Sequence, residues 1–339
     1  HYVDIGDYLN RKAKLDRITS LDNCLGDQFI REEKIIKPNE KHDWLNQRGD
    51  RFDEFIPIEP LKKFDTSARS FFTTYSNGIV TARDTWVYNF SRITVEQNMK
   101  RTIDFYNANI GRDPIFNSTK ISWTRATIQR LKHGEEIEFD SNRIIESIYR
   151  PFCCQYLYFD RQLNEVVSMM PKLFPTADTD NRVICVPSVG DRREFSVLMI
   201  NRIIESQILF TTQCFPLLYF DANGGRHDGV TDHILDEARR LYGVDVTKDD
   251  IFYYVYGFLH LPAYREKFAN ELRKSLPKLI LVPRGEDFRA LSKAGRELAE
   301  LHLNYESQPP PEGVQLIMRN AQCVMHNEQS NSQLRITNY

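Results

Sequence analysis

The stretch Ile251–His260 limits the possible folds more than any other, because it is apolar on almost every side. Thr247 and Asp250 precede it with the spacing of a capping box, which marks the start of a helix. A helix that is apolar all round has to be buried. Apolar residues at helical spacing surround this segment, so the C-terminal part of the chain is predicted to be helical. The other helices expected there are Thr231–Tyr242, Ala263–Ser275 and Asp287–Asn304.

Short β-like runs, separated by turns rich in Pro, Asp, Asn and Gly, occupy positions 144 to 220. Runs at this spacing without long helices between them favour an antiparallel or mixed sheet. The expected strands are Gln155–Phe159, Arg182–Val186, Phe195–Ile200, Ile208–Thr211 and Phe215–Phe220.

The region before these strands combines a predicted hairpin with two predicted helices. Asn77-Gly78 stands between two strand-like runs, which is a strong hairpin signal, and Trp86–Tyr88 has extended character with Trp86 expected in the core. One helix is expected with Thr94 as its N-cap, and a second after Ser122. The first would turn an apolar stripe toward the core, formed by Val95, Met99, Ile103 and Tyr106.

These patterns predict an α+β fold, in which a β-rich subdomain with an antiparallel or mixed sheet is backed by a C-terminal helical subdomain. We place the β-rich subdomain at 60–220, the helical subdomain at 221–306 and a polar tail at 307–339. Residues 1–59 form a lead-in too short and polar for a core of their own, with a strand at Tyr2–Ile5 and a helix at Leu9–Asp16. The start without Met suggests a fragment of a longer chain.

Several classes of chemistry lack their motifs. There is no GxxxxGK[ST] phosphate loop, no Gly-rich cofactor loop with an Asn/Asp-Pro-Pro-aromatic turn, and no HExxH or CxxC spacing. Glu32-Glu33-Lys34, with Asp27 upstream, matches the spelling of a nuclease centre, but such a match is common in a charge-rich segment. We therefore expect no catalytic residue, metal or cofactor in this chain.

No apolar run approaches the roughly 18–20 residues that span a bilayer, so no membrane contact is expected. The six cysteines lie mostly in apolar runs. Buried, reduced thiols of this kind fit a cytoplasmic protein.

Positive charge is concentrated in one part of the sequence. Between Pro60 and Gly134 there are twelve Lys and Arg against five Asp and Glu, although the whole chain has a net charge of −2. Such segregation is expected of a chain with one phosphate-facing surface, while an ordinary solvated face remains the alternative.

Five runs in the same order resemble the C-terminal region of type ISP restriction–modification enzymes: Ser76–Arg92, Ser147–Arg161, Gln213–Phe220, Asp250–Leu276 and Arg296–Glu306. The resemblance starts at His1, where residues 1–15 look like the end of the family's methyltransferase domain and its connector, and it is expected to end at about Glu306. It implies a module that reads a short asymmetric site on double-stranded DNA. The module would direct a neighbouring adenine methyltransferase of the same polypeptide and a helicase-type motor with its nuclease, in defence against phage. AdoMet, ATP and Mg²⁺ are then expected only for upstream domains.

Side chains that read bases are Arg or Lys for guanine, Asn or Gln for adenine, and Asp or Glu for cytosine, whereas phosphates need cations or small donors. The candidates for DNA contact are Asn77, Arg83, Asp84, Asn89, Arg112, Lys120, Arg125, Gln129, Lys132 and Arg226. Arg83 and Asp84 could instead pair within the fold, and Arg125, Gln129 and Lys132 could form a plain solvated helix face.

Two other functions remain open at this level. The chain could be an assembly module that braces the methyltransferase and the motor without reading DNA. It could also keep residual enzyme activity, although the missing Gly-rich motif predicts no cofactor binding. Salt-sensitive affinity for duplex DNA distinguishes the first of these from DNA recognition.

Overall fold

Strand β6 (Val183–Pro187) lies at the centre of the fold and is buried along its whole length. It pairs antiparallel with β7 (Leu198–Ile200) on one side and with β8 (Thr212–Pro216) on the other. β2 (Ser76–Asn77) completes a four-stranded sheet of order β2-β8-β6-β7. Alternate residues of a strand point to opposite faces. Ile184 and Val186 accordingly enter one hydrophobic core, while Val183 and Cys185 enter a second.

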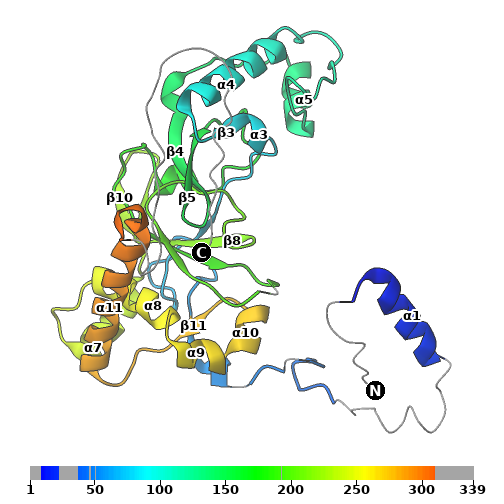
Figure 1. Cartoon of the computed structure of the whole chain (residues 1–339). Helices are drawn as coiled ribbons and strands as arrows, with labels where there is room; N and C mark the ends of the chain where they lie inside the picture. Colours follow the sequence, from blue (N-terminus) through cyan, green and yellow to red (C-terminus); the bar gives the residue numbers. More distant parts are fainter. Residues whose placement is uncertain (1–8, 23–36, 46, 50, 192, 310–339) are drawn as a thin grey trace. The chain divides into compact units, whose positions relative to one another are not determined.

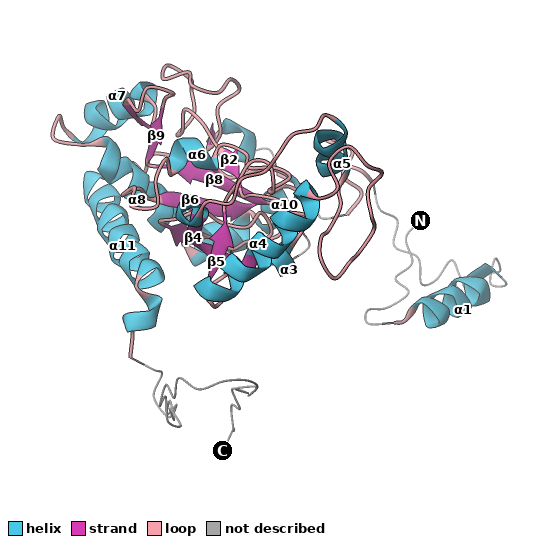
Figure 2. Cartoon of the chain, turned by 90° about the horizontal axis from the view of Figure 1, so that it is seen from above, coloured by secondary structure: helices cyan, strands magenta, loops and turns pink. Residues whose placement is uncertain are grey.

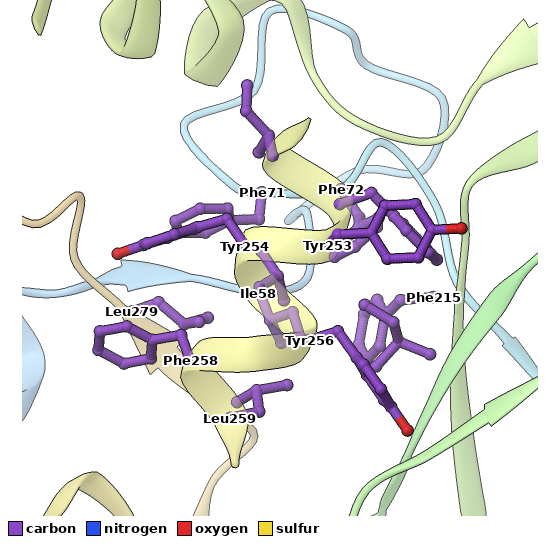
Figure 3. Close-up of a cluster of buried hydrophobic side chains, with 14 of the residues drawn as sticks. Ile58, Phe71, Phe72, Phe215, Tyr253, Tyr254, Tyr256, Phe258, Leu259 and Leu279 are labelled. Carbon is purple, nitrogen blue, oxygen red and sulfur yellow. The ribbon is translucent and has the colours of Figure 1, made fainter. Parts of the chain in front are cut away.

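The first core, here called the α8 core, surrounds helix α8 (Lys248–Leu259). Every residue from Ile251 to Leu259 is buried, and the Thr247–Asp250 capping box is present, so both expectations for this segment are confirmed. Figure 3 shows side chains leaving the helix on several sides, with Phe258 near Leu279 and Tyr256 directed toward Phe215 and the sheet.

Helix α11 (Gly285–Leu303) crosses α8 at very short range. A Cβ atom on Gly295 would lie 2.0 Å from the carbonyl oxygen of Tyr253, and one on Gly257 would lie 2.3 Å from that of Leu291. Two facing glycines therefore allow the helix backbones to touch. Ser292 adds a hydrogen bond from its hydroxyl to the Asp250 carbonyl oxygen at 2.9 Å.

Three shorter helices complete this side of the sheet: α7 (Asp232–Tyr242), α9 (Pro262–Lys267) and α10 (Ala269–Lys274). The single helix predicted for Ala263–Ser275 is thus divided at Phe268, which leaves helical geometry at φ −109° and ψ 24°. Its ring packs against Phe52 and Phe55, with centroids 5.2 and 5.3 Å away. Phe52 belongs to the 3-10 turn η1 (Arg51–Glu54), and β1 (Ile56–Pro57) pairs with β11 (Lys278–Leu279) beside it.

The second core, here called the α4 core, lies on the opposite face of the four-stranded sheet. It includes the antiparallel sheet β3-β5-β4, formed by Tyr88–Asn89, Cys153–Tyr158 and Ile144–Arg150. Helix α4 (Arg92–Asn107) buries Val95, Met99, Ile103 and Tyr106, as its stripe predicts. Figures 1 and 2 show the sheets between α8 and α11 on one side and α4 on the other.

Several local expectations are wrong in detail. Asn77-Gly78 is not a hairpin turn, because β2 pairs with β8 and Ile79 bridges Glu205. Asp84–Val87 forms the short helix α3, so Trp86 is neither extended nor fully buried. The N-cap of α4 is Ser91, whose hydroxyl accepts from the backbone N–H of Thr94. The strand predicted at Ile208–Thr211 begins only at Thr212.

The remaining elements are α1 (Arg11–Asp22), α5 (Arg125–Lys132), η2 (Ser141–Arg143), α6 (Met170–Leu173) and the hairpin of β9 (Leu218–Phe220) with β10 (Arg226–Asp228). The loop of this hairpin carries the predicted subdomain boundary at residue 221.

The computed structural model describes residues 9–22, 37–45, 47–49, 51–191 and 193–309. The predicted strand Tyr2–Ile5 and the Glu32-Glu33-Lys34 motif lie outside them. The described residues up to Leu303 form one compact unit, and a second begins at Asn304 with the turn η3 (Tyr305–Ser307). No helix in the described part is long and apolar enough to cross a membrane.

The α+β prediction with an antiparallel sheet is confirmed by this mixture of small antiparallel sheets and helices.

Candidate nucleic-acid interface

The segment that joins α4 to α5, residues 108–124, is held in place from both ends and is here called the α4–α5 loop. The Tyr106 hydroxyl donates to the Glu135 carbonyl oxygen at 3.0 Å, and the Asn107 amide bonds both backbone groups of Ile137. The Thr102 hydroxyl donates to the carbonyl oxygen of Lys120 at 3.0 Å. These bonds fix the loop and α5 against the C-terminal end of α4 (Figure 1).

Thr124 forms the N-cap of α5 and a reciprocal capping box with Thr127. The Thr124 hydroxyl also donates to Oε2 of Glu165 at 2.8 Å and accepts from Nη2 of Arg83 at 3.2 Å. The start of this eight-residue helix is therefore set by side chains from two other parts of the chain. The position of α5 is therefore fixed by hydrogen bonds to Arg83 and Glu165 as well as by its own backbone hydrogen bonds.

One face of α5 is exposed and polar. Thr127 and Leu131 are buried, whereas Arg125, Gln129 and Lys132 are exposed. At about 100° per residue these three side chains fall within roughly 60° of the helix circumference. The predicted stripe is thus a real face, and Arg112 and Lys120 are exposed on the adjoining loop.

We call Arg112, Lys120, Arg125 and Lys132 the cationic surface. Within the described ranges none of the four makes an ion pair. Four other exposed cations, which lie on α7, on α11 or directly before α11, each have a carboxylate within 4.0 Å: Arg240 with Glu237, Arg284 with Glu286, Arg289 with Asp245, and Lys293 with Glu297. The four cations of the cationic surface are therefore not neutralised by nearby carboxylates, whereas these four reference cations are.

Arg83 is placed inside the fold, with an exposed fraction of 3%. Its guanidinium donates to the carbonyl oxygens of Thr81 and Leu163 as well as to Thr124, and it faces Glu165 at 3.9 Å. Burial lowers the pKa of Arg83, while the charge of Glu165 acts in the opposite direction. This is the intramolecular alternative that the sequence left open.

The neighbouring candidates also have partners within the fold. Asp84 accepts hydrogen bonds from Thr81 and, at 3.3 Å, from the Tyr149 hydroxyl. The Asn77 amide donates to the Thr212 carbonyl oxygen at 3.0 Å, and the Asn89 side chain accepts from Ser91 N–H at 2.9 Å. Contact of these residues with DNA stays a prediction, and their present bonds disfavour it.

Arg226 is exposed on β10, in the β9–β10 hairpin, and does not belong to the cationic surface on the α4–α5 loop and α5. The structure thus brings together five of the ten candidates, Arg112, Lys120, Arg125, Gln129 and Lys132, on the α4–α5 loop and α5. It gives no shared surface to the other five.

A polar groove of about 490 Å³ was missed by the sequence interpretation. Arg92, Arg182 and Arg202 line it beside Tyr156 and Asn201. Arg182 pairs with Asp180 and Arg202 with Glu146, so this groove is close to electrically balanced. Its arginines are far apart in the sequence, so no local sequence pattern could have predicted that they line the same groove.

The candidate interface thus consists of a helix and a loop that expose cations on an α+β fold. The chain belongs to the Type ISP C-terminal specificity domain family, whose model matches residues 70–336. The family resemblance seen in the sequence is confirmed, but the expectation that it ends at about Glu306 is wrong, because the match continues to residue 336.

Three solved structures are similar to this chain. One is a cryo-EM structure of a DrdV–DNA complex, at 31% identity and a TM-score of 0.78, covering 88% of this chain and 30% of that one. A nuclease-deletion mutant of the Type ISP restriction–modification enzyme LlaGI in complex with a DNA substrate mimic has 34% identity and a TM-score of 0.74, covering 91% and 28%.

The third structure is the ATP-dependent Type ISP restriction–modification enzyme LlaBIII bound to DNA, at 31% identity and a TM-score of 0.79. The match covers 92% of this chain and 20% of LlaBIII, so this chain spans less than a third of the length of each of the three. No curated protein sequence matches the chain.

Proposed function

We propose that this chain recognises a short asymmetric sequence in double-stranded DNA. The observation that carries the proposal is the cationic surface, which leaves four exposed cations without carboxylate partners in the described part of the chain. Unpaired cations can replace the counterions condensed on a duplex, and their release drives binding. The family and the DNA-bound relatives support the same partner.

Helix α5 is the element best suited to enter the major groove, which admits an α-helix. Its exposed face places Gln129 between Arg125 and Lys132. A glutamine amide can bond N6 and N7 of adenine together, whereas the flanking cations can hold phosphates. The helix would thus combine one base contact with the contacts that set its register.

The rest of a type ISP polypeptide would supply the chemistry. Residues 1–59 would connect this module to an adenine methyltransferase domain that uses AdoMet, and a motor and nuclease would use ATP and Mg²⁺. In this arrangement the present chain has no catalytic centre or cofactor of its own. It would select the site in the cytoplasm and hold the duplex jointly with the methyltransferase.

The test measures duplex binding by the whole chain as a function of salt concentration. A variant with Ala at Arg112, Lys120, Arg125 and Lys132 should bind more weakly. The slope of log Kobs against log salt should become shallower by up to about 3.6, since each phosphate contact contributes about 0.9.

A matched control carries Ala at Arg240, Arg284, Arg289 and Lys293, which changes the net charge equally but removes cations that are already paired. Its salt slope should stay near that of the wild type. Equal losses in both variants, or no salt-sensitive binding by the wild-type chain, would reject the proposal and favour a bracing role.

A further inference from the structure

Two large apolar side chains are exposed side by side in the middle of the α4–α5 loop. Phe116 is 76% exposed and Ile115 is 54% exposed. Single exposed apolar residues are common on protein surfaces. An adjacent pair that lies between Arg112 and Lys120 of the cationic surface is a candidate for contact with the same partner.

The backbone on both sides of this pair is constrained by local structure. Pro114 precedes it with a fixed φ angle. Asn117 follows it, and its side chain accepts from the N–H and the hydroxyl of Thr119 at 3.0 and 2.6 Å. The Asn117 carbonyl oxygen also accepts from the N–H groups of Lys120 and Ile121. The fixed φ angle and these hydrogen bonds constrain the chain on both sides of the pair.

The loop is also fastened beside the start of α5. Nε1 of Trp123 donates to the Ile115 carbonyl oxygen at 2.9 Å, and the indole ring packs on Tyr106 with centroids 5.9 Å apart. Trp123 stands two residues before Arg125, the first residue of α5. The Ile115–Phe116 pair is therefore fastened next to the N-terminal end of α5.

The charge around the pair selects the kind of partner. Arg112 and Lys120 stand on either side of it, and the one carboxylate in the segment between them is Asp113. An apolar tip inside a net positive loop matches DNA, which presents an apolar base stack inside a phosphate shell. Apolar side chains that enter base steps are a known means of kinking a duplex.

We propose that Phe116, supported by Ile115, inserts between adjacent base pairs and unstacks them where the α4–α5 loop meets the duplex. This inference rests on the proposed DNA-recognition function. Insertion would add contact area to the few polar contacts of an eight-residue helix and would bend the DNA around the module. It would also make recognition depend on how easily the local step unstacks.

The experiment uses duplexes that the wild-type chain selects from a randomised library, each with one 2-aminopurine at successive positions. Binding is followed by anisotropy and unstacking by 2-aminopurine fluorescence. The wild-type chain should raise the fluorescence at one step, and Phe116→Ala should abolish the rise. Its affinity should fall by roughly 5- to 150-fold, the range for removing an aromatic that stacks on a base.

Phe90→Ala is the matched control, because Phe90 is 70% exposed but lies outside the loop. It should keep the fluorescence rise, and Phe116→Trp should restore it. Thermal unfolding of Phe116→Ala should match the wild type, since the side chain is exposed. Binding without any fluorescence rise, or a rise that survives Phe116→Ala, overturns the insertion alone. Absence of duplex binding overturns the proposed function and the insertion together.

Discussion

Arg83 donates a hydrogen bond from Nη2 to Oγ1 of Thr124 at 3.2 Å, across 41 positions of sequence. Thr124 is the N-cap of α5, so a buried arginine helps to fix the helix that presents Gln129 and two of the exposed cations. The same guanidinium donates to the carbonyl oxygens of Thr81 and Leu163. A residue that could have read DNA instead positions the element that is proposed to do so.

Arg83→Met should destabilise the chain by about 2–4 kcal/mol, because buried acceptors left without a donor cost about 1–3 kcal/mol each. The measurement is urea-induced unfolding. Arg125→Met, on the exposed face of α5, should change stability by less than about 0.5 kcal/mol but weaken duplex binding. If Arg83→Met leaves stability intact and alters only the preferred DNA sequence, Arg83 reads bases after all.

Gln129→Ala should relax one position of the selected DNA site without weakening binding to random duplex. A bidentate contact with adenine discriminates against other bases by about 1–3 kcal/mol. Sequencing of duplexes selected by the wild type and the variant gives the comparison. Gln97→Ala, at an exposed position of α4, is the control. An unchanged consensus in Gln129→Ala would show that this side chain reads no base.

Gly295→Ala should lower the unfolding free energy by about 1–3 kcal/mol or more, as overpacking does. Its added Cβ would stand 2.0 Å from the Tyr253 carbonyl oxygen. At an exposed helix position without close neighbours, Gly→Ala would stabilise the protein by about 1 kcal/mol. The sign of the change in unfolding free energy therefore shows whether α8 and α11 cross closely at Gly295. Lys293→Ala on the exposed side of α11 should be nearly neutral, and a stabilising Gly295→Ala would disprove the close crossing.

Stability should fall as pH falls through the range in which histidines titrate. His260 and His302 lie together between α8 and α11, with ring centroids 5.8 Å apart, and Tyr256 bonds to both. Burial lowers the pKa of His260; burial and then the charge of His260 lower that of His302. Below about pH 6.5 the unfolded chain therefore binds protons that the folded chain resists, which favours unfolding.

The measurement is the urea midpoint of the wild type and of His302→Gln between about pH 7.5 and 5, around the ordinary histidine pKa. The variant should lose less stability on acidification, because carboxylates contribute equally to both proteins. Parallel pH profiles would mean that His302 is not held in its neutral form.

The local pattern of the sequence was enough to predict which residues are buried and which are exposed in elements such as α8 and α5. Ile251–Leu259 is buried on every side because it has no polar face to expose. The face of α5 with Arg125, Gln129 and Lys132 is exposed because Thr127 and Leu131, on the opposite side of the helix, are the residues that are buried. The family resemblance likewise depends only on the order of short runs.

The environment of single polar side chains was decided by the tertiary structure alone. Gly78 follows Asn77 as in a hairpin turn, yet its role is to let the chain pass Ser206, whose Cα would lie 2.6 Å from an added Cβ. Arg83 stands in a charged loop segment, yet acceptors at Thr124 and Leu163 draw it inside. Periodicity reports only neighbours within a turn or two of the chain. Whether a loop side chain meets solvent or a buried acceptor depends on residues tens of positions away.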